Sequence, residues 1–160
     1  MCAGDLPAAE RALRDAVEVL ERIGETGIRS TVIGYLAEVA YGQGKEEEAE
    51  RFTEISEALT ASGDVASEVQ WRHVRAKILA RRGEIGPAVE LMTKAVEFVE
   101  TTDFLNLRGA VLVSRAEFAR LVGKPEQAPS LLEEAIRTFE QKGNVAEAGR
   151  TGALLSELTG

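Results

Sequence analysis

Apolar residues recur every three or four positions along most of the chain, which is the spacing of one face of an α-helix. Near the start, this pattern is formed by Leu6, Ala9, Leu13, Ala16, Val17, Leu20 and Ile23. Further along, it is repeated by Val89, Met92, Val96 and Val99. No segment shows a sustained alternation of apolar and polar residues, so the pattern predicts an all-α fold without a β-sheet.

Interruptions of this pattern by glycine, proline and polar residues mark the ends of the predicted helices. They predict eight helices, at 5–23, 28–43, 46–61, 65–82, 85–101, 104–122, 125–142 and 145–158. We expect the whole chain, residues 1–160, to form one helical domain.

The chain also contains an internal repeat. Its glycine anchors are Gly4, Gly44, Gly83 and Gly123, separated by 40, 39 and 40 residues. Small residues keep fixed distances from these anchors: Ala9, Ala49, Ala88 and Ala128 five residues after them, Ala16, Ser56, Ala95 and Ala135 seven further on, and Ala37, Ala76 and Ala116 seven residues before the last three. Such regularity indicates a repeat architecture.

The glycines are suited to end a helix in the left-handed conformation, which has little steric cost without a Cβ atom. The small residues indicate points where two helices approach closely. Each repeat is therefore predicted to be a helix, a tight turn and a second helix. The pairing predicts three complete pairs, with an unpaired helix at 5–23 and another at 145–158.

These offsets resemble the tetratricopeptide repeat (TPR), in which a small residue precedes a turn glycine and alanines follow it. The resemblance covers the whole chain, although the 39–40-residue period is longer than the usual period of about 34, and most aromatic consensus positions are missing. It implies a right-handed superhelix of antiparallel helix pairs, with a half repeat at each end. It also implies a concave groove, lined by the first helix of each pair, that binds a peptide or protein partner.

Three segments are similar to the C-terminal TPR region of large bacterial signalling proteins that carry a class III adenylate/guanylate cyclase domain and a P-loop ATPase module. They are "GYLAEVAYGQGKEEEAERFTEISE", "SEVQWRHVRAKILARRGE" and "TTDFLNLRGAVLVSRAEFARLVGKPEQAPSLLEEAIRTFEQKGN". The resemblance implies a scaffolding or sensing role within a multidomain regulator. ATPase-coupled transcriptional regulators have similar tails, and neither a cyclase nor an ATPase is present in this sequence.

Counting back from the glycines places three sets of residues on the expected groove. These sets are Thr31, Gly34, Glu38 and Tyr41; Gln70, His73, Lys77 and Arg81; and Ala110, Val113, Glu117 and Arg120. Within the second set, His73, Lys77 and Arg81 form one stripe. This stripe could bind an acidic peptide or a C-terminal carboxylate. Alternatively, it is a solvated helix face whose charge is balanced by Glu38 and Glu117. Trp71, Val74 and Ile78 fall on another face and are expected to pack.

Charge and composition exclude several classes of function. The chain has 27 acidic and 19 basic residues and a net charge of −8, which opposes binding to nucleic acid. No apolar stretch approaches 18 residues, and the N-terminus does not resemble a signal peptide, so we expect a cytoplasmic protein without a membrane span.

The sequence shows no set of catalytic or metal-binding residues. Cys2 is the only cysteine and His73 the only histidine, whereas zinc takes three or four protein ligands. The segment "GQGKEEE" lacks the GxxxxGK[ST] spacing of a phosphate-binding loop. We therefore expect no cofactor, no metal and no enzymatic activity.

The apolar stripe of helix 5–23 is expected to be covered on one side only, by helix 28–43. Leu6, Leu13 and Leu20 are therefore candidate interface residues, since open apolar patches usually bind a partner. That partner would be an upstream domain or a second copy of the chain. The C-terminal segment "AEAGRTGALLSELTG" is expected to cap the other end.

Overall fold

The computed structural model describes residues 5–160, which are all-α. Within this range there are eight α-helices and one short 3-10 helix, η1 (Pro125–Gln127). The α-helices are α1 (Leu6–Arg22), α2 (Gly27–Gly42), α3 (Glu46–Leu59), α4 (Val65–Arg81), α5 (Ile85–Glu100), α6 (Leu105–Leu121), α7 (Ala128–Lys142) and α8 (Val145–Thr159). The predictions that concern Cys2 and Gly4 lie outside the described residues.

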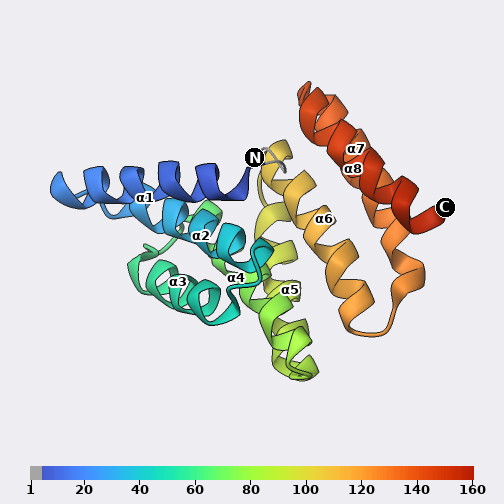
Figure 1. Ribbon diagram of the computed structural model, residues 1–160, viewed down its shortest axis with the longest axis horizontal. Coiled ribbons are helices and arrows are strands. Elements are labelled where there is room, and N and C mark those ends of the chain that lie inside the picture. The colour runs from blue at the N-terminus through green and yellow to red at the C-terminus, as the bar shows by residue number, and fades with distance from the viewer. Residues whose placement is uncertain (1–4) are drawn as a thin grey trace.

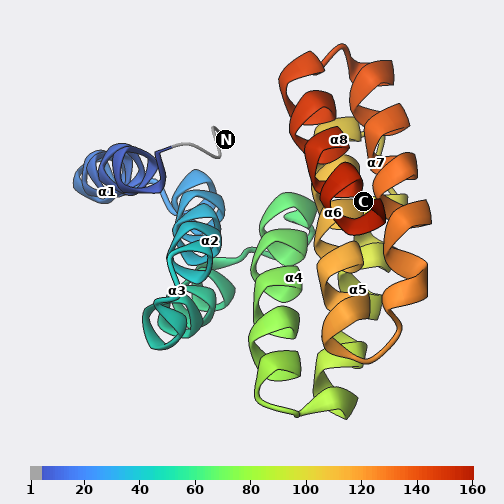
Figure 2. The ribbon, with the colours of Figure 1, turned by 45° about the vertical axis from the view of Figure 1, so that its right-hand side comes forward.

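Consecutive helices pack as antiparallel pairs (Figure 1). The most extensive contacts join α2 with α3, α4 with α5, and α6 with α7. In addition, α4 contacts both α2 and α6, so these three helices form one row (Figure 2). At the two ends, α1 packs on α2 and α8 packs on α7. The predicted all-α fold, the eight helices and their antiparallel pairing are confirmed.

The repeated small residues lie where the paired helices meet. Ala49, Ala88 and Ala128 are at most 1% exposed. Their anchors Gly44, Gly83 and Gly123 all have positive φ, between 76° and 82°, as expected for glycine ends of helices. The equivalent Ala9 in α1 is only half-buried, because among the described helices α1 packs mainly on α2.

Most helix boundaries agree with the predictions within one or two residues, but α7 begins later. The segment 125–127 forms the tighter 3-10 turn, and regular α-helix starts at Ala128. Pro125 and Pro129 both lie in this region. An α-helix starting at residue 125 would need a hydrogen bond from the residue 129 N–H to the Pro125 carbonyl, and Pro129 has no N–H to donate, which favours the 3-10 start.

Candidate functional site

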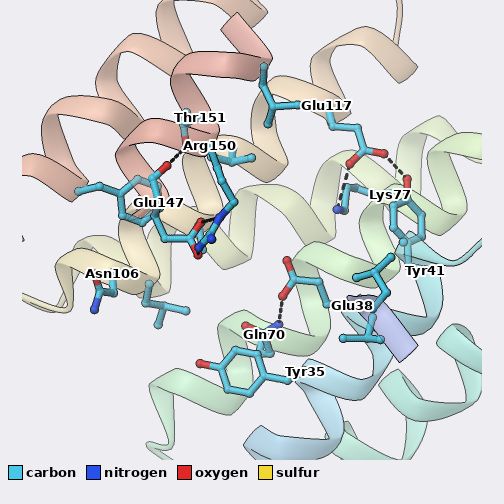
Figure 3. Close-up of a pocket in the computed structure, with 18 of the residues that line it drawn as sticks. Tyr35, Glu38, Tyr41, Gln70, Lys77, Asn106, Glu117, Glu147, Arg150 and Thr151 are labelled. Atoms are coloured by element: carbon cyan, nitrogen blue, oxygen red, sulfur yellow. Dashed lines mark hydrogen bonds and ion pairs between the residues drawn. The ribbon is translucent and has the colours of Figure 1, made fainter. Parts of the chain in front are cut away.

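A cavity of about 630 Å³ lies on the face formed by α2, α4, α6 and α8, with contributions from α1 and α7 (Figure 3). Its polar lining comprises Tyr35, Glu38, Tyr41, Gln70, Lys77, Arg81, Asn106, Glu117, Asn144, Glu147, Arg150 and Thr151. Its apolar lining comprises Leu6, Val39, Gly42, Leu107, Ala110, Val113, Phe139 and Leu154. A concave site that combines apolar surface with convergent polar groups is typical of a binding site.

Many residues assigned to the groove from sequence meet in this cavity. Its lining includes Glu38, Tyr41, Gln70, Lys77, Arg81, Ala110, Val113 and Glu117. The other four residues of these sets lie elsewhere: Gly34 and His73 are buried, Arg120 is exposed outside the cavity lining, and the Thr31 hydroxyl is hydrogen-bonded to Ser67 (2.7 Å).

His73 does not lie on the groove surface, and the expected stripe is therefore wrong at this position. Its side chain is fully buried, and its Nδ1 is 2.7 Å from the hydroxyl of Ser114 on α6. Burial lowers the pKa of His73 to about 4, which keeps the ring neutral at physiological pH. His73 thus joins α4 to α6 and contributes no positive charge to the cavity.

Lys77 and Arg81 are both held by Glu117 on α6. The Lys77 Nζ lies 3.1 Å from Glu117 Oε2, and the Arg81 Nη2 lies 3.3 Å from Oε1. The Tyr41 hydroxyl on α2 donates a hydrogen bond to the same Oε1 (2.6 Å). Both cations also lie over the Tyr41 ring, at 4.4 Å for Lys77 and 3.9 Å for Arg81.

The pKa values in this cluster reflect the same contacts. Burial alone would raise the pKa of Glu117, but Lys77, the Tyr41 hydroxyl and Arg81 lower it by more, so the net shift is downward. Burial and the hydrogen bond to Glu117 raise the pKa of Tyr41. The carboxylate is therefore ionised and the phenol protonated at neutral pH. Lys77 and Arg81 are therefore both paired within the protein, although they share the single negative charge of Glu117.

Glu38 occupies a different position, near the middle of the cavity (Figure 3). Its Oε2 accepts a hydrogen bond of 3.0 Å from the Gln70 side chain on α4. Gln70 in turn packs against Gly34, where a Cβ atom would lie only 2.6 Å from the Gln70 Cγ. A larger residue at Gly34 would displace Gln70, so the glycine fixes the amide that holds Glu38.

The wall opposite Glu38 comes from α8 and was missed from sequence, because the last helix was interpreted as a cap. Its Glu147 and Arg150 form an ion pair, and the Thr151 hydroxyl donates to the Glu147 backbone carbonyl (2.8 Å) (Figure 3). The signal for this wall was present in the sequence as Glu147 and Arg150, three residues apart on one helical face.

The remaining basic residues of α4 and its C-cap are also paired. Arg72 pairs with Glu68, and Arg75 pairs with Glu57 at 2.6 Å. Arg82 pairs with Glu46 and Glu50, at 2.9 and 2.7 Å. Trp71, Val74 and Ile78 are buried as predicted, with Arg72 and Arg75 stacked on the Trp71 ring. Each cation between residues 70 and 84 therefore has an acidic partner within the protein.

The candidate interface on α1 is open in part. Leu6, Leu13 and Leu20 are half-buried, whereas Val19 is 51% and Ile23 69% exposed. Ile28, at the start of α2, is 59% exposed. This end of the molecule therefore shows apolar surface beyond the three leucines named from sequence.

No protein-family model, curated protein or solved structure matches the chain. Within residues 5–160, no helix is both long and apolar enough to cross a membrane. The same range contains no cluster of three or more His, Cys, Asp or Glu side chains arranged to hold a metal ion.

Proposed function

We propose that this protein is a non-catalytic interaction module that binds a peptide or protein partner in the cavity between α2, α4, α6 and α8. One observation carries the proposal: residues at equivalent repeat positions, such as Glu38, Lys77 and Glu117, line a single cavity. A repeat array that presents successive helices to one cavity is suited to an extended ligand.

We also propose that the fold is a TPR-like right-handed superhelix, as the sequence resemblance implies. The antiparallel pairs, the left-handed glycines and the buried alanines support it. We further propose that the module serves as the C-terminal TPR region of a bacterial cyclase–ATPase regulator, on the basis of the sequence resemblance described above. In that setting the module would work in the cytoplasm and bind a partner without acting on it chemically.

The test is a selection of random dodecapeptides displayed on phage, using the 160-residue protein as bait. Binding of the selected peptides would be measured by fluorescence anisotropy. The blocking variant is Ala110→Arg, which places a long side chain on the cavity wall. Its matched control is Ala58→Arg, the same change at an exposed position of α3 outside the cavity.

The proposal expects peptides that bind the wild type and Ala58→Arg equally but bind Ala110→Arg at least tenfold more weakly, on the order of a lost buried contact. Circular dichroism would verify that both variants remain helical. Peptides that bind all three proteins equally, or no enriched peptides at all, would contradict the proposal.

A second candidate function is oligomerisation through α1, favoured by the exposed Val19, Ile23 and Ile28. Light scattering after size exclusion, over a concentration series, tests it. A mass that doubles with concentration in the wild type but stays near 17.3 kDa in Ile23→Glu would support a homodimer. A constant monomer mass in the wild type would rule this function out.

A further inference from the structure

Each cation among the described residues that line the cavity has an acidic partner. Lys77 and Arg81 share Glu117, and Arg150 pairs with Glu147. Among the described residues that line the cavity, Glu38 is the one carboxylate without a cationic partner. A half-buried carboxylate without a cationic partner is available to pair with a cation of a ligand.

The surroundings of Glu38 keep it in place without neutralising it. Gln70 donates one hydrogen bond to Oε2, which orients the carboxylate but carries no charge. The nearest histidine, His73, is neutral because burial lowers its pKa to about 4. Tyr35, one helical turn before Glu38, adds an aromatic ring to the same part of the cavity (Figure 3). A carboxylate beside an aromatic ring is a favourable environment for a cation.

Apolar side chains flank this site. Val39 lies next to Glu38 on α2, and Leu107, Ala110 and Val113 on α6 line the same cavity. The long stems of lysine and arginine pack well on such surfaces while their charged heads reach a polar partner. The protein's net charge of −8 would also attract a basic ligand over a longer range.

We propose that the cavity recognises a peptide through a lysine or arginine side chain that pairs with Glu38, while neighbouring apolar residues of the peptide contact the α6 wall. This inference rests on the proposed peptide-binding function and specifies the chemistry of its ligand. It reverses the polarity expected from sequence, since the groove selects a basic residue and Lys77 and Arg81 are already engaged by Glu117.

The experiment uses the same dodecapeptide library, sorted by the charge of the enriched peptides. Glu38→Gln removes the charge and retains an oxygen that accepts the Gln70 hydrogen bond. Glu38→Lys reverses the charge. The matched controls are Glu54→Gln and Glu54→Lys, because Glu54 is exposed on α3 outside the cavity.

The expected result is enrichment of lysine- or arginine-containing peptides flanked by apolar residues. Their affinity should fall about tenfold or more in Glu38→Gln, as for a lost charged hydrogen bond, and further in Glu38→Lys. The Glu54 variants should bind as the wild type does. Raising the salt concentration should weaken binding to the wild type more than binding to Glu38→Gln.

Two outcomes would overturn the inference while leaving the proposed function intact. The first is enrichment of acidic peptides that Ala110→Arg still blocks. The second is enrichment of basic peptides whose affinity does not change in Glu38→Gln. If no peptide depends on Ala110, the failure belongs to the proposed function instead, so the two proposals are tested separately.

Discussion

The aromatic ring of Phe139 on α7 lies directly against the backbone of Gly109 on α6. A Cβ atom at Gly109 would be only 2.5 Å from the Phe139 Cε1, closer than side-chain carbons approach one another. Phe139 is 2% exposed and belongs to the core cluster that joins α6, α7 and α8. The α6–α7 packing therefore depends on the absence of a side chain at one position.

We expect Gly109→Ala to lower the free energy of unfolding by about 1–3 kcal/mol, because the methyl group overpacks the contact with Phe139. The control is Gly149→Ala in α8, where a Cβ meets nothing within 4 Å. That change should be neutral or stabilise the protein by up to about 1 kcal/mol. Urea unfolding followed by circular dichroism measures both. Equal effects of the two substitutions would contradict the packing explanation.

A second prediction concerns Ala88, which is 0% exposed where α5 meets its neighbours. Ala88→Leu should cost about 1–3 kcal/mol by overpacking. Ala9→Leu, at the equivalent repeat position in the half-buried α1, should cost much less. Thermal unfolding of the two variants compares them. If Ala9→Leu destabilised the protein as much as Ala88→Leu, α1 would be more tightly packed than the structure shows.

The buried His73 predicts a specific dependence of stability on pH. In the unfolded chain its pKa is near the ordinary value of 6.5, whereas burial lowers it to about 4 in the folded protein. As the pH falls below 6.5, the unfolded chain takes up a proton that the folded protein does not. The contribution of the neutral His73 to the free energy of unfolding is therefore complete above pH 6.5, declines as the pH falls, and is lost below pH 4.

Between pH 7 and pH 5 the free energy of unfolding should fall by about 2 kcal/mol. His73 is the only histidine, and the carboxylates titrate mainly below this window, so urea unfolding at these two pH values isolates its effect. In His73→Gln the difference should nearly vanish. A pH dependence that is unchanged in His73→Gln would show that another group is responsible.

The ion pair between Glu117 and the buried Lys77 should contribute more to the free energy of unfolding than an ion pair exposed on the surface. Glu117→Gln leaves Lys77, whose side chain is 6% exposed, without its carboxylate. The free energy of unfolding should fall by about 1–3 kcal/mol. Glu97→Gln removes the exposed pair with Lys94, which is 60% exposed, and should change stability by less than about 0.5 kcal/mol. Chemical unfolding at low ionic strength measures both, and equal changes would refute the special role of Glu117.

The sequence predicted the helices and their pairing because these depend on local features: the three-to-four spacing of apolar residues, the glycine ends and the repeated alanines. It also placed Lys77, Arg81 and Glu117 on one surface, since the repeat register fixes which helical face each residue occupies. Of the two carboxylates expected to balance the stripe, Glu117 pairs with both Lys77 and Arg81, whereas Glu38 pairs with neither.

The sequence pattern could not determine how deeply each side chain is buried. His73 follows the same register as Lys77, yet it is buried against Ser114, a residue 41 positions away. Glu38 was expected to balance cations, but it accepts a hydrogen bond from Gln70 instead. The α8 wall was missed because the last helix was expected only to cap the array. Such features depend on how closely neighbouring helices approach, which no local pattern specifies.

One carboxylate, that of Glu117, connects three helices at one end of the cavity: α2 through Tyr41, and α4 through Lys77 and Arg81, with Glu117 itself on α6. The separation of these helices is therefore set there partly by charge, whereas the separation of α6 and α7 at Gly109 is set by the absence of a side chain. Ions in solution screen charge but do not change atomic radii. The width of the cavity should thus depend more on ionic strength at this end, where Glu117 and Arg81 are partly exposed, than at the contact of Gly109 with Phe139.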